Sequence, residues 1–227
     1  MDPAIRVCDL TKSFTLHVQG GVTIPVFTKL GLVVEPGECV ALTGPSGVGK
    51  STLLRVLYAN YKADSGQILV RHLDRWVDMG RAREQEILEV RKRTIGFVSQ
   101  FLRVVPRVPC LDIVSEPLRS LGVGAEEAKR KAEILLDLLR IPKRLWSIAP
   151  ATFSGGEQQR INIARSFAAD YPIMLLDEPT ASLDARNGAT VTQLIRDAKQ
   201  RGAAIVGIFH DEEDCQAVAD RTFEMGL

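Results

Sequence analysis

The sequence has no surplus of either charge and no long hydrophobic run, and these absences narrow the classes of protein that it can encode. Its 29 lysines and arginines nearly balance 28 aspartates and glutamates, which leaves a net charge of +1. A surface that attracts nucleic acid carries a marked positive excess, so we expect no nucleic-acid partner. No apolar run approaches the length of a membrane-spanning helix, and the start MDPAIRVCDL does not resemble a signal peptide. We therefore expect a cytoplasmic protein without direct membrane contact.

Cysteine is scarce as well. The four cysteines, Cys8, Cys39, Cys110 and Cys215, lie far apart and show no paired spacing. Disulfide frameworks and zinc sites use regularly spaced cysteines, so we expect four reduced thiols that serve as small buried residues. With 227 residues, 45% of them hydrophobic, the chain can bury a substantial core in one large domain, 1–227.

One glycine-rich stretch fits a phosphate-binding pattern. The sequence GPSGVGKS, from Gly44 to Ser51, matches G-x-x-x-x-G-K-[S/T], with a predicted strand before it and a predicted helix after it. Glycines let the backbone N–H groups turn inward, Lys50 offers a positive charge to the β- and γ-phosphates, and Ser51 offers a hydroxyl to Mg²⁺. The helix N-terminus adds a positive partial charge. The stretch therefore predicts a nucleotide site.

Three further predicted strands end on polar side chains. Residues 95–99 lead to Gln100, residues 173–176 lead to Asp177 and Glu178, and residues 203–209 lead to His210. Ligands bind at the carboxyl ends of the strands in open parallel sheets, so these side chains are expected beside the phosphate loop. Asp177 is then the metal-side acid, Glu178 can orient or deprotonate water, and His210 can contact the γ-phosphate. Gln100 suits Mg²⁺ or the attacking water, but a polar residue that merely ends a strand is an equal alternative.

Between residues 101 and 150 the pattern changes from strands to helices, which are predicted over 111–121 and 125–140. We interpret this segment as a helical subdomain, extending into the next helix, inserted into an α/β core formed by 1–100 and 151–227. Ser154, Gly155 and Gly156 then precede a helix whose N-terminus offers free N–H groups to an anion. The chain thus has a second phosphate-binding element.

The remaining segments carry weaker signals. Residues 5–10, 23–27 and 30–34 are short β-rich runs, and 74–93 mixes charges of both signs, which predicts a solvated helix. Phe14, just ahead of a predicted hairpin, can stack on an adenine ring or belong to the core, and spacing alone does not choose. His17 and His72 follow no such strand and are expected to be structural or surface residues.

Taken in order, GPSGVGKS, Gln100, FSGGEQQR, LLDEP, SLD and His210 resemble the ATP-binding cassette (ABC) ATPases, and the resemblance covers essentially the whole chain. It implies an α/β P-loop NTPase fold with a mostly parallel sheet, an N-terminal antiparallel β subdomain and an inserted helical subdomain. It also implies hydrolysis of ATP with Mg²⁺, and a second ABC cassette, from the same or another subunit, that completes each ATP site.

The resemblance assigns roles to single residues. Catalysis falls to Lys50, Gln100, Glu178 and His210, and metal binding to Ser51, Gln100 and Asp177. Nucleotide binding falls to Phe14, to the Walker A loop Gly44, Pro45, Ser46, Gly47, Val48, Gly49, Lys50, Ser51 and Thr52, and to the signature Ser154, Gly155, Gly156 and Glu157. The signature departs from the usual pattern at Phe153, where leucine is usual, and at Glu157, where glutamine is usual. Neither departure removes the donors of Ser154, Gly155 and Gly156, but by the resemblance Glu157 changes the charge expected near a bound γ-phosphate.

A narrower resemblance concerns three stretches, VSQFLRVVPRVP, LLRVLYANY and ATFSGGEQQRINIARSFAADYP. They are similar to the L subunits of the bacterial carbon–phosphorus lyase (phosphonate-utilisation) system. That family implies an ATPase that works with soluble lyase subunits in the synthesis of ribose 1-methylphosphonate 5-triphosphate. Two alternatives share the same ATPase chemistry: a nucleotide-binding subunit of an ABC membrane transporter, and a module in which ATP switches assembly on a macromolecule such as DNA.

Overall fold

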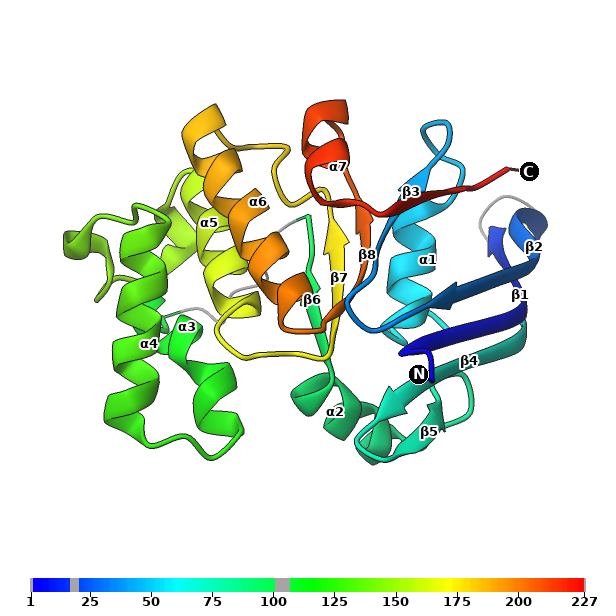
Figure 1. The fold of residues 1–227 in the computed structure, drawn as a ribbon, viewed down its shortest axis with the longest axis horizontal. Coiled ribbons are helices and arrows are strands. Elements are labelled where there is room, and N and C mark those ends of the chain that lie inside the picture. Colours follow the sequence, from blue (N-terminus) through cyan, green and yellow to red (C-terminus); the bar gives the residue numbers. More distant parts are fainter. Residues whose placement is uncertain (1, 17–20, 101–106, 227) are drawn as a thin grey trace.

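The structure is a computed structural model that describes residues 2–16, 21–100 and 107–226. Two sheets and a group of helices lie side by side (Figure 1). The parallel sheet has the strand order β6-β7-β8-β3-β9, and the antiparallel sheet has the order β2-β1-β4-β5. The α/β class expected from the sequence is confirmed.

The elements have the following bounds. The parallel strands are β3 (Cys39–Thr43), β6 (Ile95–Val98), β7 (Ile173–Asp177), β8 (Ala204–Ile208) and β9 (Arg221–Glu224). The antiparallel strands are β1 (Ile5–Leu16), β2 (Val22–Val34), β4 (Ser65–His72) and β5 (Arg75–Asp78). The helices are α1 (Lys50–Leu57), α2 (Glu84–Arg93), α3 (Cys110–Ser120), α4 (Ala125–Leu138), α5 (Gly155–Ser166), α6 (Ala185–Gln200) and α7 (Glu212–Val218), with short 3₁₀ turns η2 (Lys143–Leu145) and η3 (Pro150–Thr152).

Four strands of the parallel sheet, β3, β6, β7 and β8, are buried along nearly their whole length, which explains their continuous apolar runs. On β7, Ile173 and Leu175 pack on the side of α1 and the antiparallel sheet, whereas Met174 and Leu176 pack on the side of α5 and α6. Helix α1 lies between the two sheets, and α3 and α4 pack beyond α5 at the other end of the molecule (Figure 1). The five strands run parallel, so their carboxyl ends lie at one edge of the sheet, and the arrows of β6, β7 and β8 point to this edge at the top of Figure 1.

The expected helix over 74–93 is wrong in its first part. Residues Arg75–Asp78 form strand β5, and the helix begins only at Glu84. Val77 pairs with Val70 of β4 and is buried in the core, and Trp76 pairs with Arg71. Aromatic and β-branched side chains next to an available sheet edge favour a strand here. The charges outside this short run hid the strand in the sequence, because they belong to the turn and to α2.

Other expectations differ in detail. The runs 23–27 and 30–34 lie in one continuous strand, β2, whose pairing with β1 shifts register near Lys29, where the backbone is left-handed with φ 49°. His72 is buried, and its Nδ1 lies 2.6 Å from Thr94 Oγ1, whereas His17 lies outside the described residues.

All four cysteines are free, but only Cys39 and Cys110 are buried. Burial raises the pKa of each of these two to about 12. Cys8 and Cys215 are only partly buried.

Within the residues that the structure describes, no helix is both long enough and apolar enough to cross a membrane.

Candidate functional site

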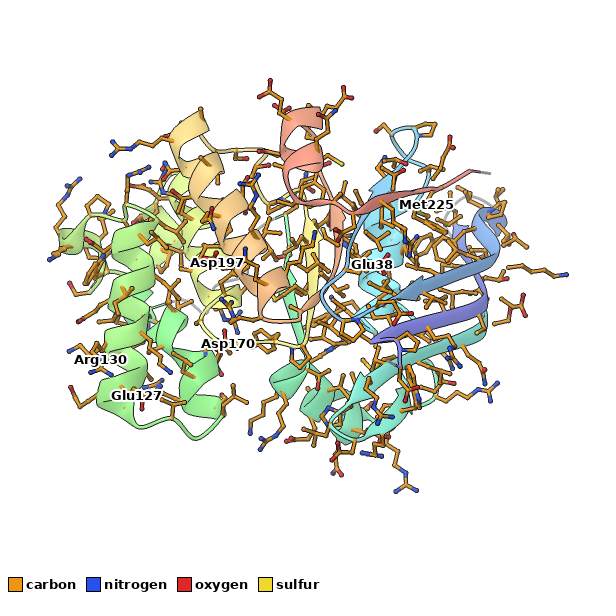
Figure 2. The ribbon with its side chains drawn as sticks, in the orientation of Figure 1. Glu38, Glu127, Arg130, Asp170, Asp197 and Met225 are labelled. Atoms are coloured by element: carbon orange, nitrogen blue, oxygen red, sulfur yellow. The ribbon has the colours of Figure 1, made fainter. Side chains whose placement is uncertain are left out.

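The phosphate loop links the end of β3 to the start of α1, as the motif requires. Gly44 and Gly49 have φ values of 129° and 104°, which residues other than glycine rarely adopt. A Cβ at Gly44 would lie 2.6 Å from the carbonyl oxygen of Met225, which is labelled in Figure 2. A Cβ at Gly49 would overlap the side chain of Val26. The loop therefore needs glycine at both ends to keep its curvature.

Lys50 folds back over the loop that precedes it. Its Nζ donates to the carbonyl oxygens of Gly44 at 2.6 Å and Pro45 at 2.9 Å. These two bonds hold the ammonium group at the mouth of the loop, where it can meet a phosphate. The first turn of α1, which the structure describes in full, holds no acidic side chain, so the positive end of this helix is not neutralised locally.

The side chains of Ser51, at the end of the phosphate loop, and Asp177, at the end of β7, form a hydrogen bond. Ser51 Oγ donates to Asp177 Oδ1 at 2.8 Å. Asp177 is only 1% exposed, and its other carboxylate oxygen, Oδ2, is buried with no hydrogen-bond partner among the described residues. Burial raises the pKa of Asp177, and the bond from Ser51 opposes that rise. A carboxylate oxygen without a partner beside a hydroxyl is the kind of hard oxygen pair that Mg²⁺ takes as ligands. The residues present fit Mg²⁺.

Glu178 stands next to Asp177 in a left-handed conformation, with φ 51°. Its N–H donates to the carbonyl oxygen of Ile208, at the end of β8, at 3.1 Å, which fixes the residue at the sheet edge. Gln100, which lies just beyond β6, donates from Nε2 to Glu178 Oε2 at 3.5 Å. His210 follows β8 and is exposed. The structure thus places these predicted residues at the same sheet edge as the phosphate loop; their chemical roles stay predictions.

Ser154 caps the N-terminus of α5. Glu157 N–H donates to Ser154 Oγ at 3.3 Å, while the Ser154 N–H and hydroxyl both donate to Glu157 Oε2, at 2.9 and 2.8 Å. These bonds from Ser154 hold the pKa of Glu157 below its usual value. The backbone N–H groups of Gly155 and Gly156 lie in the first turn, where a helix offers them no acceptor.

The two expected phosphate-binding elements do not meet within one chain. α1 packs on one face of the parallel sheet, whereas α5 packs on the opposite face. What lies close to Gly156 is the loop after Glu178: a Cβ at Gly156 would lie 3.3 Å from the Ser182 carbonyl oxygen. That loop ends at Asp184, which caps α6 by accepting from the Asn187 N–H at 2.8 Å.

Phe14 lies in β1, opposite Ile24 of β2, and is partly buried. Its ring meets the edge of Tyr61 at a centroid distance of 5.4 Å, and Lys12 Nζ lies 4.7 Å from its centroid. The ring is therefore already held by protein contacts. Stacking on adenine stays a prediction.

Sequence patterns did not indicate Asn162 on α5. Its side chain is buried and donates from Nδ2 to the carbonyl oxygen of Ser99 at 2.6 Å, directly before Gln100. The signal was present in the sequence, because asparagine is a poor helix former and lies here between apolar residues Ile161 and Ile163. Only the fold, however, reveals which carbonyl group it reaches.

Comparison with known proteins identifies relatives of the whole chain. The sequence profile described as "ABC transporter" matches residues 27–181. An uncharacterized ABC transporter ATP-binding protein of Thermotoga maritima is 35% identical over 92% of this chain and 87% of its own length. The lipoprotein-releasing system ATP-binding protein LolD of Shewanella sp. (strain MR-4) is 37% identical over 92% of this chain and 88% of its own. The macrolide export ATP-binding/permease protein MacB of Brucella abortus is 35% identical, and this chain spans 33% of its length.

Among solved structures, the dimeric post-hydrolysis state of the ATP-binding cassette MJ0796, bound to ADP and Pi, superposes with a TM-score of 0.86 at 28% identity. The match covers 97% of this chain and 94% of that one. The P-loop NTPase fold of ABC cassettes and the capacity to bind and hydrolyse ATP, both expected above, are therefore established. Together with the site geometry, these matches show that the chain belongs to the ABC transporter family, as one of its ATP-hydrolysing subunits.

Proposed function

We propose that two ABC cassettes, this chain and a second one, enclose two ATP molecules between them. In each site one cassette supplies the phosphate loop, Asp177, Glu178 and His210, and the other supplies Ser154 to Gly156. The observation that carries the proposal is the placement of α1 and α5 on opposite faces of the parallel sheet. Free N–H donors at a helix N-terminus favour an anion, and the chain cannot bring its own phosphate loop to them. The dimeric state of the MJ0796 relative supports the same arrangement.

The residues at the sheet edge divide the chemistry of hydrolysis. Ser51 and Asp177 would hold Mg²⁺, which would offset the negative charge of the phosphates. Lys50 binds the γ-phosphoryl oxygens, on which charge develops during transfer. Glu178 orients or deprotonates the attacking water, and Gln100, which lies 3.5 Å from it, helps to hold that carboxylate or the water. His210 contacts the γ-phosphate from the end of β8.

ATP binding then drives closure of the two cassettes. A ligand present at about a thousand times its dissociation constant favours the bound state by roughly 4 kcal/mol, and hydrolysis removes that bias. Such a cycle performs work only on a partner that responds to closure.

A cavity of about 440 Å³ lies between the α2–β6 side and the α3–α5 side of the cassette, lined in part by Tyr58, Leu88, Arg91, Phe97 and Arg165. Its aromatic and cationic lining suits a docked partner segment.

For the partner, we propose the permease of a membrane transporter. The relatives support this choice: LolD is named as part of a lipoprotein-releasing system, and MacB as an export ATP-binding/permease protein. A second candidate is the soluble carbon–phosphorus lyase assembly that carries out phosphonate breakdown. It is favoured by the stretches around Gln100, after the phosphate loop and before Asp177, which resemble the L subunits of that system. None of the relatives reported above is named as part of that system.

The partner is tested by isolating the tagged protein, at native expression level, from detergent-solubilised cells and identifying what co-purifies. Permease subunits in stoichiometric amount support the transporter. Soluble lyase subunits instead overturn it in favour of the second candidate. A strain that lacks the gene separates the two again, because loss of growth on phosphonate as sole phosphorus source is expected only for the lyase.

The catalytic assignment is tested with Glu178→Gln. Because the amide can still accept a hydrogen bond but cannot deprotonate water, turnover should fall about 10²- to 10⁴-fold while ATP binding is retained. Glu126→Gln, an exposed change in the first turn of α4, is the control and should hydrolyse ATP normally. If Glu178→Gln hydrolyses ATP at the wild-type rate, the role of Glu178 is refuted.

The two-cassette site is tested by dilution. If the ATPase activity per chain stays constant on dilution through the nanomolar range, that site is refuted.

A further inference from the structure

Helix α5 carries three buried polar side chains, Gln159, Asn162 and Ser166, and the last two contact the edge of the parallel sheet without a part in the proposed ATP chemistry. Asn162 and Ser166 are 4% and 8% exposed and lie four residues apart, so they project from the same side of the helix. Asn162 Nδ2 donates to the Ser99 carbonyl oxygen at 2.6 Å, and Ser166 Oγ donates to the Phe97 carbonyl oxygen at 3.0 Å. The helix is thus bound at two points to one segment of main chain.

That segment is the edge of the parallel sheet. Among the described residues β6 pairs with β7 on one side only, so its other row of carbonyl groups lacks a strand partner there. Carbonyl groups two residues apart point to the same side of a strand, which is why a single helix face reaches both Phe97 and Ser99. The two bonds differ in position. Phe97 lies within β6, whereas Ser99 lies beyond its end, one residue before Gln100.

We propose that Asn162 is a positioning residue for ATP hydrolysis, acting through the Ser99 carbonyl group on Gln100 and Glu178. The chain of contacts runs from Ser154 at the start of α5, along the rigid helix to Asn162, across to Ser99, and through Gln100 to Glu178 Oε2 at 3.5 Å. In a two-cassette assembly this series of contacts connects the two ATP sites. Helix α5, which touches the nucleotide of one site, is connected to the Glu178 carboxylate, which serves the other site.

The same contact lies where a partner would act. A cavity of about 380 Å³ is lined by Ser99, Gln100 and Asn162 together with Arg55, Tyr58 and Arg165, and it shares Tyr58, Phe97 and Arg165 with the larger cavity described above. A segment docked there would press against the Asn162–Ser99 bond. The inference rests on the proposed roles of Gln100 and Glu178, and it gives this buried amide a function that a core residue would not have.

The test compares two variants that each lose one α5-to-edge bond. Asn162→Leu keeps the size of the side chain and removes the donor beside Gln100, and Ser166→Ala removes the donor to Phe97, away from Gln100. Both should lower the melting temperature. Only Asn162→Leu should lower kcat, about tenfold, with the KM for ATP within about twofold of wild type, because a shift of an ångström in a catalytic group costs rate rather than binding.

The inference is overturned if folded Asn162→Leu retains wild-type kcat, if Ser166→Ala loses as much kcat, or if the loss appears in KM alone. Should Asn162→Leu melt too low to assay, Asn162→Ala replaces it, since water from the adjoining cavity can reach the Ser99 carbonyl group. Glu178→Gln is measured alongside. If that variant hydrolyses ATP normally, the proposed site itself fails; if it is inactive while Asn162→Leu matches Ser166→Ala, only the present inference fails.

Discussion

Replacing Asp177 by asparagine should move the stability of the protein in opposite directions with and without nucleotide. In the protein without ligand, the buried Oδ2 of Asp177 has no hydrogen-bond partner among the described residues, and Ser51 contacts only Oδ1. Asparagine has nearly the same shape and can keep the contact to Ser51, but it removes the buried negative charge. The ligand-free variant should therefore be more stable than the wild type.

The magnitude follows from the unpartnered oxygen. An unsatisfied buried polar group costs about 1–3 kcal/mol, and the amide that replaces it recovers only part of this, so we expect a gain of about 1–2 kcal/mol. For a domain of this size about 1 kcal/mol corresponds to roughly 2–4 °C in melting temperature. Wild type at about a hundredfold excess of Mg-ATP over Kd gains roughly 2.7 kcal/mol, and Asp177→Asn should lose most of that gain.

The pH dependence has a definite sign. Burial raises the pKa of Asp177 in the folded state above the ordinary value of 3.8. The folded protein therefore binds this proton at higher pH than the unfolded chain does, so stability from this group is fully present below the unfolded-state pKa and is lost as pH rises through the folded-state pKa. The advantage of Asp177→Asn should be largest at neutral pH and should shrink as the pH falls toward 4.

The assay is thermal unfolding of wild type, Asp177→Asn and the control Asp74→Asn, which lies in the exposed turn between β4 and β5. Each is melted alone, with ATP and EDTA, and with ATP and Mg²⁺. A ligand-free Asp177→Asn that melts below wild type, or one that keeps the full Mg²⁺-dependent rise, would show that Asp177 is a structural carboxylate and not the metal-side acid.

Two further outcomes are expected. Glu157→Gln removes a carboxylate beside the proposed γ-phosphate site, so in a Glu178→Gln background it should tighten ATP-dependent dimerisation about fivefold, measured by sedimentation; unchanged or weaker dimerisation contradicts this. Burial lowers the pKa of His72 below 6.5, with Arg75 adding to the shift, so the folded state binds this proton less readily and stability is lost as pH falls through and below 6.5. His72→Gln should therefore lose less melting temperature than wild type between pH 7.5 and 5.5, and an equal loss in both would contradict it.

The sequence predicted those parts of the site that depend on strand ends. The phosphate loop, Gln100, Asp177 and His210 follow apolar runs, and parallel strands must deliver their carboxyl ends to one edge, so their common position follows from the order of these runs along the chain. The fold class followed from the same alternation of strands and helices.

What the sequence could not supply was the set of contacts between segments far apart in the chain. The bond from Ser51 to Asp177, the unpartnered Oδ2, and the reach of Asn162 to Ser99 all depend on how elements pack. Strand β5 was missed for a related reason: its four residues form a strand because β4 offers them an edge, and the flanking charges hide that short apolar run. Local pattern carries no information about such an edge.

The pairing of β3 with β8 and β9 also constrains how the protein is made. Cys39 lies opposite Ile205, and Thr43 lies opposite Glu224, so the strand that leads into the phosphate loop has no neighbours in its sheet until nearly all of the described chain has left the ribosome. At about 5–20 residues per second, translation leaves this strand unpaired for roughly ten seconds or more. This hydrophobic strand, buried in the finished fold, is therefore exposed on the nascent chain during that time.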